Sequence, residues 1–339
     1  MPEGMSRDKL RAKAKAVAAS TGNDPQTVIR LYAIERFLAR VSESSAAPKI
    51  VLKGGVLLGS LLGIAARPTK DMDATVMGID LAGGEAHSLV SEIASFDLGD
   101  GMSFSVGDPS DIMEGRTYSG LRIPVTASCD RTRVSFVVEL SAGDPITPAP
   151  VDLRVFSVFG DDSLTVRAYP VATAAAEKIE TVLSRGTAST RPRDSYDLLM
   201  MDRRLLGDTP DAELAEACRA TMGARGTLRA ADNWNATLDA IASDAGQLRQ
   251  WERFVASHSY ASGVTLPECM AAAENICRRA LGAPEPHATR NPAMTRVKIP
   301  EPTKAKSVSP AADERSARAT SRSAASPRAG HPRRERPNL

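Results

Sequence analysis

The chain has few aromatic residues, few cysteines and few histidines. Phe, Trp and Tyr make up 4% of its 339 residues, so we expect a core built mainly from aliphatic side chains. The four cysteines form no CxxC pair and the four histidines are scattered, which argues against a structural zinc site. We expect the thiols to be reduced, as is usual in the cytosol.

Long hydrophobic runs are also absent. The longest apolar stretch, Val56 to Ala66, is shorter than the roughly 20 residues that a membrane-spanning helix needs. The segment from Met1 to Ser20 is charged and rich in alanine, without the apolar centre of a secretory signal. We therefore expect a cytoplasmic protein with no membrane partner.

Positive charge is unevenly distributed along the chain. The net charge is +2, but the residues from Pro284 onward carry 12 Lys and Arg against 5 Asp and Glu. The rest of the chain carries 31 basic against 36 acidic residues. Residues 284–339 are rich in Pro, Ser, Ala and Arg and nearly lack large apolar side chains, so this basic tail is predicted to be disordered.

The order of periodic segments predicts an α/β part followed by an all-α part. We expect an N-terminal helical segment over 1–45, a core over 46–170 and a helical domain over 171–283. Helices are expected over 5–20, 25–42, 56–64, 85–95, 173–184, 195–206, 211–222, 234–243, 248–257 and 267–281. Residues 50–52 are expected to be either the end of a strand or a buried entry into the next helix. Strands are expected from about 70 to 76 and over 103–106, 121–127, 134–140 and 155–159.

The stretch IVLKGGVLLGSLLGIAARPTKDMDATV, Ile50 to Val76, carries the clearest chemical signal. Side chains alternate across a strand, so Asp71 and Asp73 should face the same side with Cα atoms roughly 6.5–7 Å apart. Two carboxylates at that spacing repel each other unless a cation lies between them, and hard Mg²⁺ prefers oxygen ligands. We therefore predict a Mg²⁺ (or Mn²⁺) site of the kind that phosphoryl and nucleotidyl transfer requires.

Neighbouring residues supply the other parts of a phosphate site. Gly54 and Gly55 let the backbone approach a ligand, and the helix that follows offers free N–H groups to phosphate. Lys53 and Arg67 add positive charge. A third carboxylate is expected from a neighbouring strand, and Glu139 is the best candidate because it interrupts an apolar run.

Each of these features has an ordinary structural explanation when taken alone. Most DxD triplets are solvated surface turns, a glycine pair is usually a turn, and a lone Glu in a strand often faces solvent. Their order along the chain is much more specific: a glycine pair, a helix, a strand with DxD and a strand with Glu.

In this order the sequence resembles the nucleotidyltransferase family that includes the AbiEii-type toxins of abortive-infection and toxin–antitoxin systems, within the polymerase-β-like superfamily. The family pattern is K-G-G-x-x-L followed by R-x-[ST]-x-D-[LIM]-D. It is matched here by Lys53, Gly54, Gly55, Arg67, Thr69, Asp71 and Asp73.

Two later blocks extend the resemblance over about residues 45 to 210. The block VVELSAGDPITP places Glu139 at the acidic position, where many members carry Asp, and Asp144 after a glycine. The block AAEKIETVLSR, with RPRDSYDLLMM after it, supplies Lys178, Arg193, Asp194 and Asp197.

The resemblance implies a nucleotidyltransferase core with a mixed sheet and a helical C-terminal part. It implies a nucleoside triphosphate as substrate, Mg²⁺ or Mn²⁺ as cofactor and a separate antitoxin protein as partner. Some similar proteins, the mycobacterial tRNA-modifying toxins among them, add nucleotides to the 3′ end of tRNA and block aminoacylation. The expected function is therefore transfer of a nucleoside monophosphate to RNA, foremost to the 3′ end of tRNA, which blocks translation.

The resemblance also implies roles for individual residues. Asp71, Asp73 and Glu139 would hold the metal, and Glu139 would help to deprotonate or orient the acceptor hydroxyl. Lys178 would neutralise the triphosphate, and Asp194 would belong to the catalytic set. The implied nucleotide-binding residues are Lys53, Gly54, Gly55, Arg67, Thr69, Lys178 and Arg193.

Alternatives stay open at this level. The acceptor could be a protein side chain, or the chain could be a binding protein that keeps the fold without the chemistry, although the retained acids and Lys178 argue against the latter. Lys178 could equally be a solvated helix residue, and Asp194 could be an N-cap. Arg191 and Arg193 could contact phosphate or pair with the nearby acids. The sequence does not indicate which nucleotide or which RNA is used.

Overall fold

The computed structural model describes residues 4–81, 84–112, 120–160 and 164–282. The chain divides into two units, 1–302 and 303–339, and every described residue belongs to the first. The disorder predicted for 284–339 lies outside the described residues. The boundaries expected near residues 45 and 170 stay predictions.

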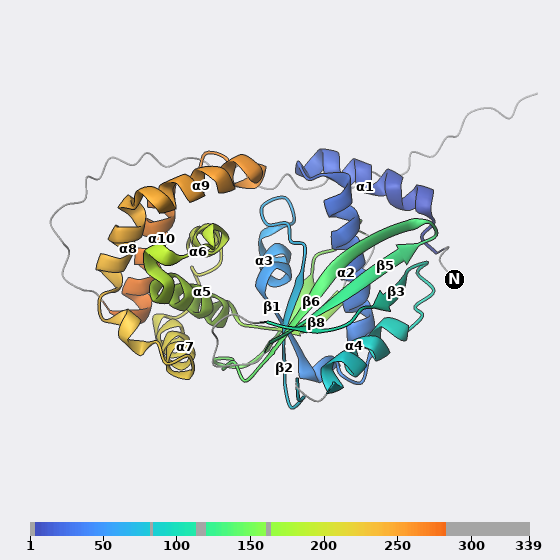
Figure 1. Cartoon of the computed structure of the whole chain (residues 1–339), viewed down its shortest axis with the longest axis horizontal. Coiled ribbons are helices and arrows are strands. Elements are labelled where there is room, and N and C mark those ends of the chain that lie inside the picture. The colour runs from blue at the N-terminus through green and yellow to red at the C-terminus, as the bar shows by residue number, and fades with distance from the viewer. Residues whose placement is uncertain (1–3, 82–83, 113–119, 161–163, 283–339) are drawn as a thin grey trace, which may run out of the picture. The chain divides into compact units, whose positions relative to one another are not determined.

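A mixed eight-stranded sheet forms the centre of the first half of the chain (Figure 1). Its strand order is β3-β5-β6-β2-β1-β8-β7, with β4 paired to β5. Strand β2 lies between β1, to which it is antiparallel, and β6, to which it is parallel. The strands are β1 (Ile50–Lys53), β2 (Met72–Val76), β3 (Ser103–Val106), β4 (Ser110–Asp111), β5 (Gly120–Cys129), β6 (Thr132–Ala142), β7 (Val151–Val155) and β8 (Leu164–Ala168).

Four helices accompany this sheet. They are α1 (Arg7–Thr21), α2 (Pro25–Glu43), α3 (Gly54–Leu62) and α4 (Glu85–Ser95). Asp24 is the N-cap of α2, because its carboxylate accepts a hydrogen bond from the Thr27 N–H at 2.9 Å, and Pro25 occupies the first turn. Helix α2 packs on β6 and β8, while α3 contacts β1, β2 and β7. The short helix α3 thus begins directly at the end of β1, beside β2.

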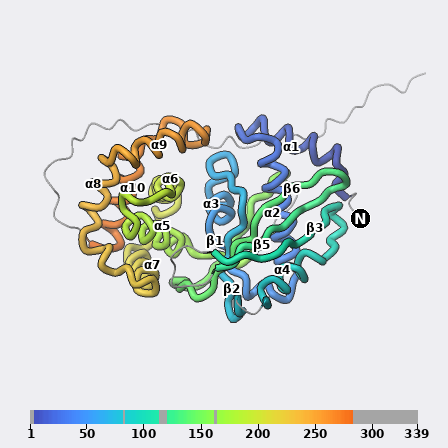
Figure 2. The backbone as a smooth tube through the Cα atoms, viewed as in Figure 1, coloured from blue at the N-terminus to red at the C-terminus, as the bar shows by residue number. Residues whose placement is uncertain are grey.

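The second half of the described chain is helical, as predicted. The backbone trace in Figure 2 shows these helices gathered beside one another. They are α5 (Val171–Arg185), α6 (Pro192–Arg204), α7 (Asp211–Ala224), α8 (Trp234–Ser243), α9 (Ala245–Ser257) and α10 (Leu266–Leu281). A capping box between Thr265 and Glu268 begins α10. Helix α5 packs against α6 and α7, and α6 also contacts α3, so α5 and α6 adjoin the sheet at α3.

The core is mainly aliphatic, as the composition indicates. The few aromatic side chains gather in groups: Phe37, Phe104 and Phe136 meet edge to face beside the sheet. A second group in the helical half contains Tyr196, Phe254 and Tyr260. All four cysteines are buried and free. Among the described residues, no helix is long and apolar enough to cross a membrane.

The strand predicted over 155–159 was wrong. The strand lies over 151–155, and β8 over 164–168 was not predicted. The apolar run after Val155 is buried as loop rather than strand. Its Val158 N–H donates to the Glu35 carboxylate at 2.6 Å, and Phe159 packs against Tyr32 with ring centroids 4.6 Å apart. Burial by α2 therefore explains the hydrophobic pattern without a strand.

Candidate active site

Four charged side chains form a row across the centre of the sheet. Arg122 on β5 pairs in register with Glu139 on β6, Glu139 with Asp73 on β2, and Asp73 with Lys53 on β1. Residues in register on adjacent strands lie about 5 Å apart. The fold thus places the predicted third acid directly beside the DxD motif.

Asp71 extends this row by one position, since it lies two residues before Asp73 and immediately before β2 begins. Met72 and Ala74 alternate with the two acids and are buried, whereas both acids are partly exposed. Burial raises the pKa of Asp71 above its ordinary value, and the neighbouring Asp73 carboxylate raises it further. The pair is therefore an electrostatically unfavourable arrangement that a cation would relieve.

The glycine pair lets the Asp73 carboxylate pack against the start of α3. The Gly55 N–H donates to Asp73 Oδ2 at 3.2 Å. Gly54 has a φ of 61°, and a Cβ at this position would overlap the Asp73 side chain. A Cβ at Gly55 would overlap Thr69, whose hydroxyl donates to the Asp71 carbonyl at 3.2 Å. Both glycines are thus required by close packing against the segment that carries the two acids.

Glu139 is paired with Arg122 at 3.1 Å, in a bridge whose side chains are 29% and 48% exposed respectively. Among the described residues, no group of three or more His, Cys, Asp or Glu side chains is arranged to hold a metal ion. Binding of a metal by Asp71, Asp73 and Glu139 together therefore stays a prediction. An exposed bridge contributes only about 0–1 kcal/mol, so Glu139 can exchange Arg122 for another cation at little cost.

The donor chemistry of this row fits a hard divalent cation. Mg²⁺ is commonly bound by one or two carboxylates, with phosphate oxygens and water completing its shell. Asp71 and Asp73 satisfy that requirement, and Glu139 lies on the adjacent strand in register with Asp73.

A second group of charges joins α5 and α6 to the segment before β2. The Arg67 guanidinium pairs in bidentate fashion with Asp197, at 2.5 and 3.0 Å. Lys178 Nζ lies 2.7 Å from Asp197 and 2.8 Å from Asp194, and Arg191 lies 2.9 Å from Asp194. Three cations thus surround two anions, which leaves this group, the Lys178 cluster, with a net positive charge.

Burial and pairing oppose each other within the Lys178 cluster. Burial alone would raise the pKa of Asp197, but Arg67 and Lys178 lower it to about 2. Burial alone would lower the pKa of Lys178, but Asp194 and Asp197 raise it above its ordinary value. Asp197 and Lys178 are therefore both charged at neutral pH. Asp194 is not an N-cap, because α6 begins at Pro192 and no side chain caps it.

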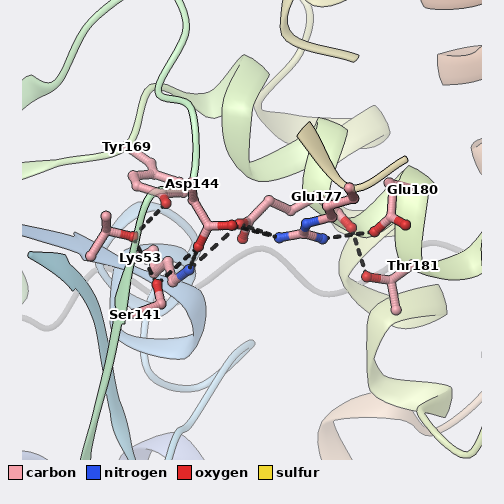
Figure 3. A network of polar contacts seen from close by, with 9 residues as sticks. Lys53, Ser141, Asp144, Tyr169, Glu177, Glu180 and Thr181 are labelled. Atoms are coloured by element: carbon pink, nitrogen blue, oxygen red, sulfur yellow. Dashed lines mark hydrogen bonds and ion pairs between the residues drawn. The ribbon is translucent and has the colours of Figure 1, made fainter. Parts of the chain in front are cut away.

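Lys53 belongs to a third group, shown in Figure 3. Its Nζ lies 2.8 Å from Asp144 and 3.5 Å from Glu177. The Arg225 guanidinium, just after α7, bonds Glu177 at 2.6 Å and Glu180 at 2.7 Å. Burial would raise the pKa of Asp144, but Lys53 and Arg225 lower it to about 2. The three acids exceed the two bases, so this group, the Lys53 network, has a net negative charge.

All eleven residues predicted for the site line a single cleft of ≈ 960 Å³. The acids Asp71, Asp73 and Glu139 line this cleft, as do residues of the Lys53 network and of the net positive Lys178 cluster. Lys53, Arg67 and Lys178 all have carboxylate partners, so their predicted phosphate contacts would compete with these pairs. Cleft-lining residues that sequence reasoning missed include Arg122, Glu177, Glu180, Arg225, Phe254 and His258.

Arg193 lines this cleft and precedes Asp194 of the Lys178 cluster on α6. It does not pair with Asp194 or Asp197 in the contacts described; its Nη2 lies 3.0 Å from His258 Nε2. The pairing of Arg191 with Asp194, one of the two alternatives open from sequence, is observed.

The chain matches a known protein family over most of its length. A family model described as nucleotidyl transferase AbiEii toxin, type IV TA system, matches residues 36–274. The crystal structure of JHP933 from Helicobacter pylori is similar, with 13% identity, 76% of this chain and 94% of that chain covered, and a TM-score of 0.43. A second H. pylori structure, of a protein whose nucleotidyltransferase assignment is provisional, has 15% identity, coverage of 76% and 97%, and a TM-score of 0.41. No curated protein sequence matches the chain.

Proposed function

Because the chain belongs to the AbiEii family of nucleotidyl transferase toxins of type IV toxin–antitoxin systems, we propose that it transfers a nucleoside monophosphate from a nucleoside triphosphate to the 3′ end of transfer RNA. Loss of a free acceptor end would block translation. The family also implies an antitoxin as a partner, and we propose that this is a separate protein which neutralises the toxin.

One observation carries the proposal: the cleft combines a row of carboxylates with a cluster of cations. Nucleotidyl transfer needs both, because the triphosphate must be neutralised while the acceptor oxygen is activated. A divalent cation, when bound, would offset charge on the triphosphate and the attacking oxygen. A surface that only binds nucleic acid has no need of paired acids facing its ligand.

We propose the following roles for the residues of the chain. Asp71 and Asp73 would hold the cation, and Glu139, which is paired with Arg122, would be a third carboxylate ligand. Glu139 also accepts the proton from the acceptor hydroxyl or orients that hydroxyl. Lys178, with its neighbour Arg191, offsets charge that develops on the triphosphate in the transition state.

The orientation of the substrate follows from the charges around the cleft. The Lys178 cluster is net positive, whereas the Lys53 network is net negative. The triphosphate should therefore lie toward Lys178 and Arg191, away from Glu177 and Glu180, with the reacting phosphorus beside Asp71 and Asp73. Nucleotide-binding roles for Gly54, Gly55 and Thr69 stay predictions. These roles require only that the three residues line the part of the cleft that the nucleotide occupies.

The test is a label-partition experiment. Purified protein is incubated with each of the four α-³²P-labelled nucleoside triphosphates, Mg²⁺, total RNA and total cell protein. We expect one or more nucleotides to label an RNA of tRNA size, with the label removed by enzymes that trim 3′ ends and with no labelling when EDTA is added. Label in protein bands instead would replace the RNA acceptor with a protein side chain. Absence of label from both polymers would contradict the proposed activity.

A further inference from the structure

The His258 imidazole contacts the Arg193 side chain in the cleft. His258 Nε2 lies 3.0 Å from Arg193 Nη2, and both residues line the cleft. His258 follows α9, far along the chain from the motifs that carry the family resemblance. Arg193 is the second residue of α6, next to Asp194 of the Lys178 cluster. A residue of α6 is thus fixed by a residue from the end of α9.

The surroundings of the imidazole determine which nitrogen carries the proton. His258 Nδ1 lies 2.9 Å from the Phe254 carbonyl oxygen, which can only accept a hydrogen bond, and 2.9 Å from the Ser257 hydroxyl, which can donate or accept. The Arg193 guanidinium can only donate, so Nε2 is the unprotonated nitrogen that accepts from it, and Nδ1 carries the proton. The ring also stacks on Phe254, with centroids 4.5 Å apart and an interplanar angle of 28°.

We infer that His258 is a positioning residue: its unprotonated Nε2 holds Arg193 toward the triphosphate, and protonation of the imidazole releases Arg193. The inference rests on the proposed function in one respect, because it takes Arg193 as a ligand of the triphosphate. A protonated ring has two N–H donors and no acceptor, so it can no longer bond the guanidinium and instead repels it.

The groups around the ring favour the unprotonated form. Burial lowers the pKa of His258 from its ordinary 6.5; the Phe254 carbonyl opposes this, and the cations Arg193, Lys70 and Arg67 lower it further. Tyr260, from the short helix Ser259–Ala261, lies edge-on with ring centroids 5.3 Å apart. Its own pKa is raised, chiefly by burial, so it is neutral near pH 7. Arg193 is thus held at neutral pH and released as pH falls below the pKa of His258.

Imidazole NMR tests the pair without any enzymatic assay. The full-length protein is labelled with ¹⁵N-histidine, and the His258 signal is identified by its loss in His258→Gln. We expect the Nδ1–H tautomer and, in Arg193→Gln, a higher pKa for His258 because one facing cation is gone. An Nε2–H tautomer, or a pKa that Arg193→Gln leaves unchanged, would overturn the inference.

Kinetics then test the consequence for the nucleotide. The KM for the triphosphate is compared at pH 7.5 and pH 5.5 in wild type, His258→Gln and His258→Ala. The Gln amide oxygen can accept from Arg193 but does not titrate, so its KM should be low at both pH values. His258→Ala should raise KM roughly tenfold at pH 7.5, as expected for loss of a charge-assisted hydrogen bond that orients a ligand. Wild type should match His258→Gln at pH 7.5, and at pH 5.5 its KM should move toward that of His258→Ala by the protonated fraction of His258 that the NMR titration gives.

The matched control is His87→Gln, which alters a histidine on α4 that does not line the cleft. The KM of His87→Gln should equal that of wild type at both pH values, which shows that the pH effect belongs to His258 and not to any histidine of the chain. Titration of the triphosphate itself is measured by His258→Gln, in which residue 258 does not titrate. A His258→Gln enzyme whose KM rises at pH 5.5 as much as in wild type would overturn the inference. Absence of transfer by wild type with all four triphosphates would instead contradict the proposed function, and the NMR result would still decide whether His258 holds Arg193.

Discussion

At the scale of single residues, Asp73 has the most demanding surroundings in the site. It is in register with Lys53 and Glu139, and its carboxylate accepts the Gly55 N–H. The Asp73 side chain leaves no room for a Cβ at position 54, which is glycine. The position of this carboxylate is therefore fixed by two strands and the start of a helix at once.

Gly54→Ala should consequently impair both stability and transfer. The new Cβ would overlap Asp73 and would also occupy a backbone conformation with φ of 61°. Gly22→Ala is the matched control, since Gly22 has a φ of 72° but open space around it. The control should lose only about 1–2 kcal/mol of unfolding free energy, the cost of a positive φ, and keep its activity. Urea denaturation and transfer rates measure the two effects. Equal losses in the two variants would show that Gly54 is required for its φ alone.

Individual residues of the site were predictable to different degrees. The DxD pair and the glycine pair are local patterns, so their sequence spacing already indicated their common position. Arg122 could have been found by counting outward from the two-residue turn after Cys129, which sets its register with Glu139. The pairing of Arg67 with Asp197 joins residues 130 positions apart, and no local pattern reports it.

At the scale of elements, Lys178 fastens α5 to α6. Its Nζ is buried against Asp194 and Asp197, which both lie on α6. The view of Lys178 as a solvated helix residue is therefore wrong. The same side chain that is proposed to face the triphosphate also neutralises two buried carboxylates, so its loss has two separable effects.

Lys178→Ala should lower transfer by roughly 100-fold, the usual effect of removing one group that stabilises developing charge. It should also reduce the free energy of unfolding by roughly 3–5 kcal/mol, because two buried carboxylates lose a partner. Lys178→Arg keeps the charge and should retain most of the stability. Lys15→Ala, at an exposed position on α1, is the control and should resemble wild type in both assays. Wild-type kinetics in a folded Lys178→Ala enzyme would remove Lys178 from the mechanism.

Helices were predicted more accurately than strands. Apolar periodicity and caps define α2, α4 and α8 to within about one residue of their ends. The strand β7 was misplaced because the apolar run that follows it is buried by α2, and a short buried loop has the same composition as a strand. The sheet order was beyond prediction, because it depends on pairing between segments remote in the chain.

At the scale of the whole molecule, the cleft brings together a net positive cluster and a set of carboxylates from different parts of the chain. The cations of the Lys178 cluster come from α5, from the start of α6 and from the segment before β2, while the DxD acids and Glu139 come from the sheet and its edge. Asp73 and Lys178 lie more than 100 residues apart in the sequence, so only the folded chain forms the site. This division of charge is the physical basis of the central claim, that the cleft carries out nucleotidyl transfer.

The most direct measurement compares label transfer to RNA by wild type, Asp71→Asn, Asp73→Asn and Asp152→Asn under single-turnover conditions with Mg²⁺. Asp152 is an exposed acid on β7 outside the cleft, so its variant controls for the loss of one charge. Asn is nearly the same size as Asp, and thermal unfolding verifies that each variant is folded. We expect transfer to fall below detection in the Asp71 and Asp73 variants and to match wild type in Asp152→Asn. Undiminished transfer by a folded Asp71→Asn or Asp73→Asn enzyme would contradict the account.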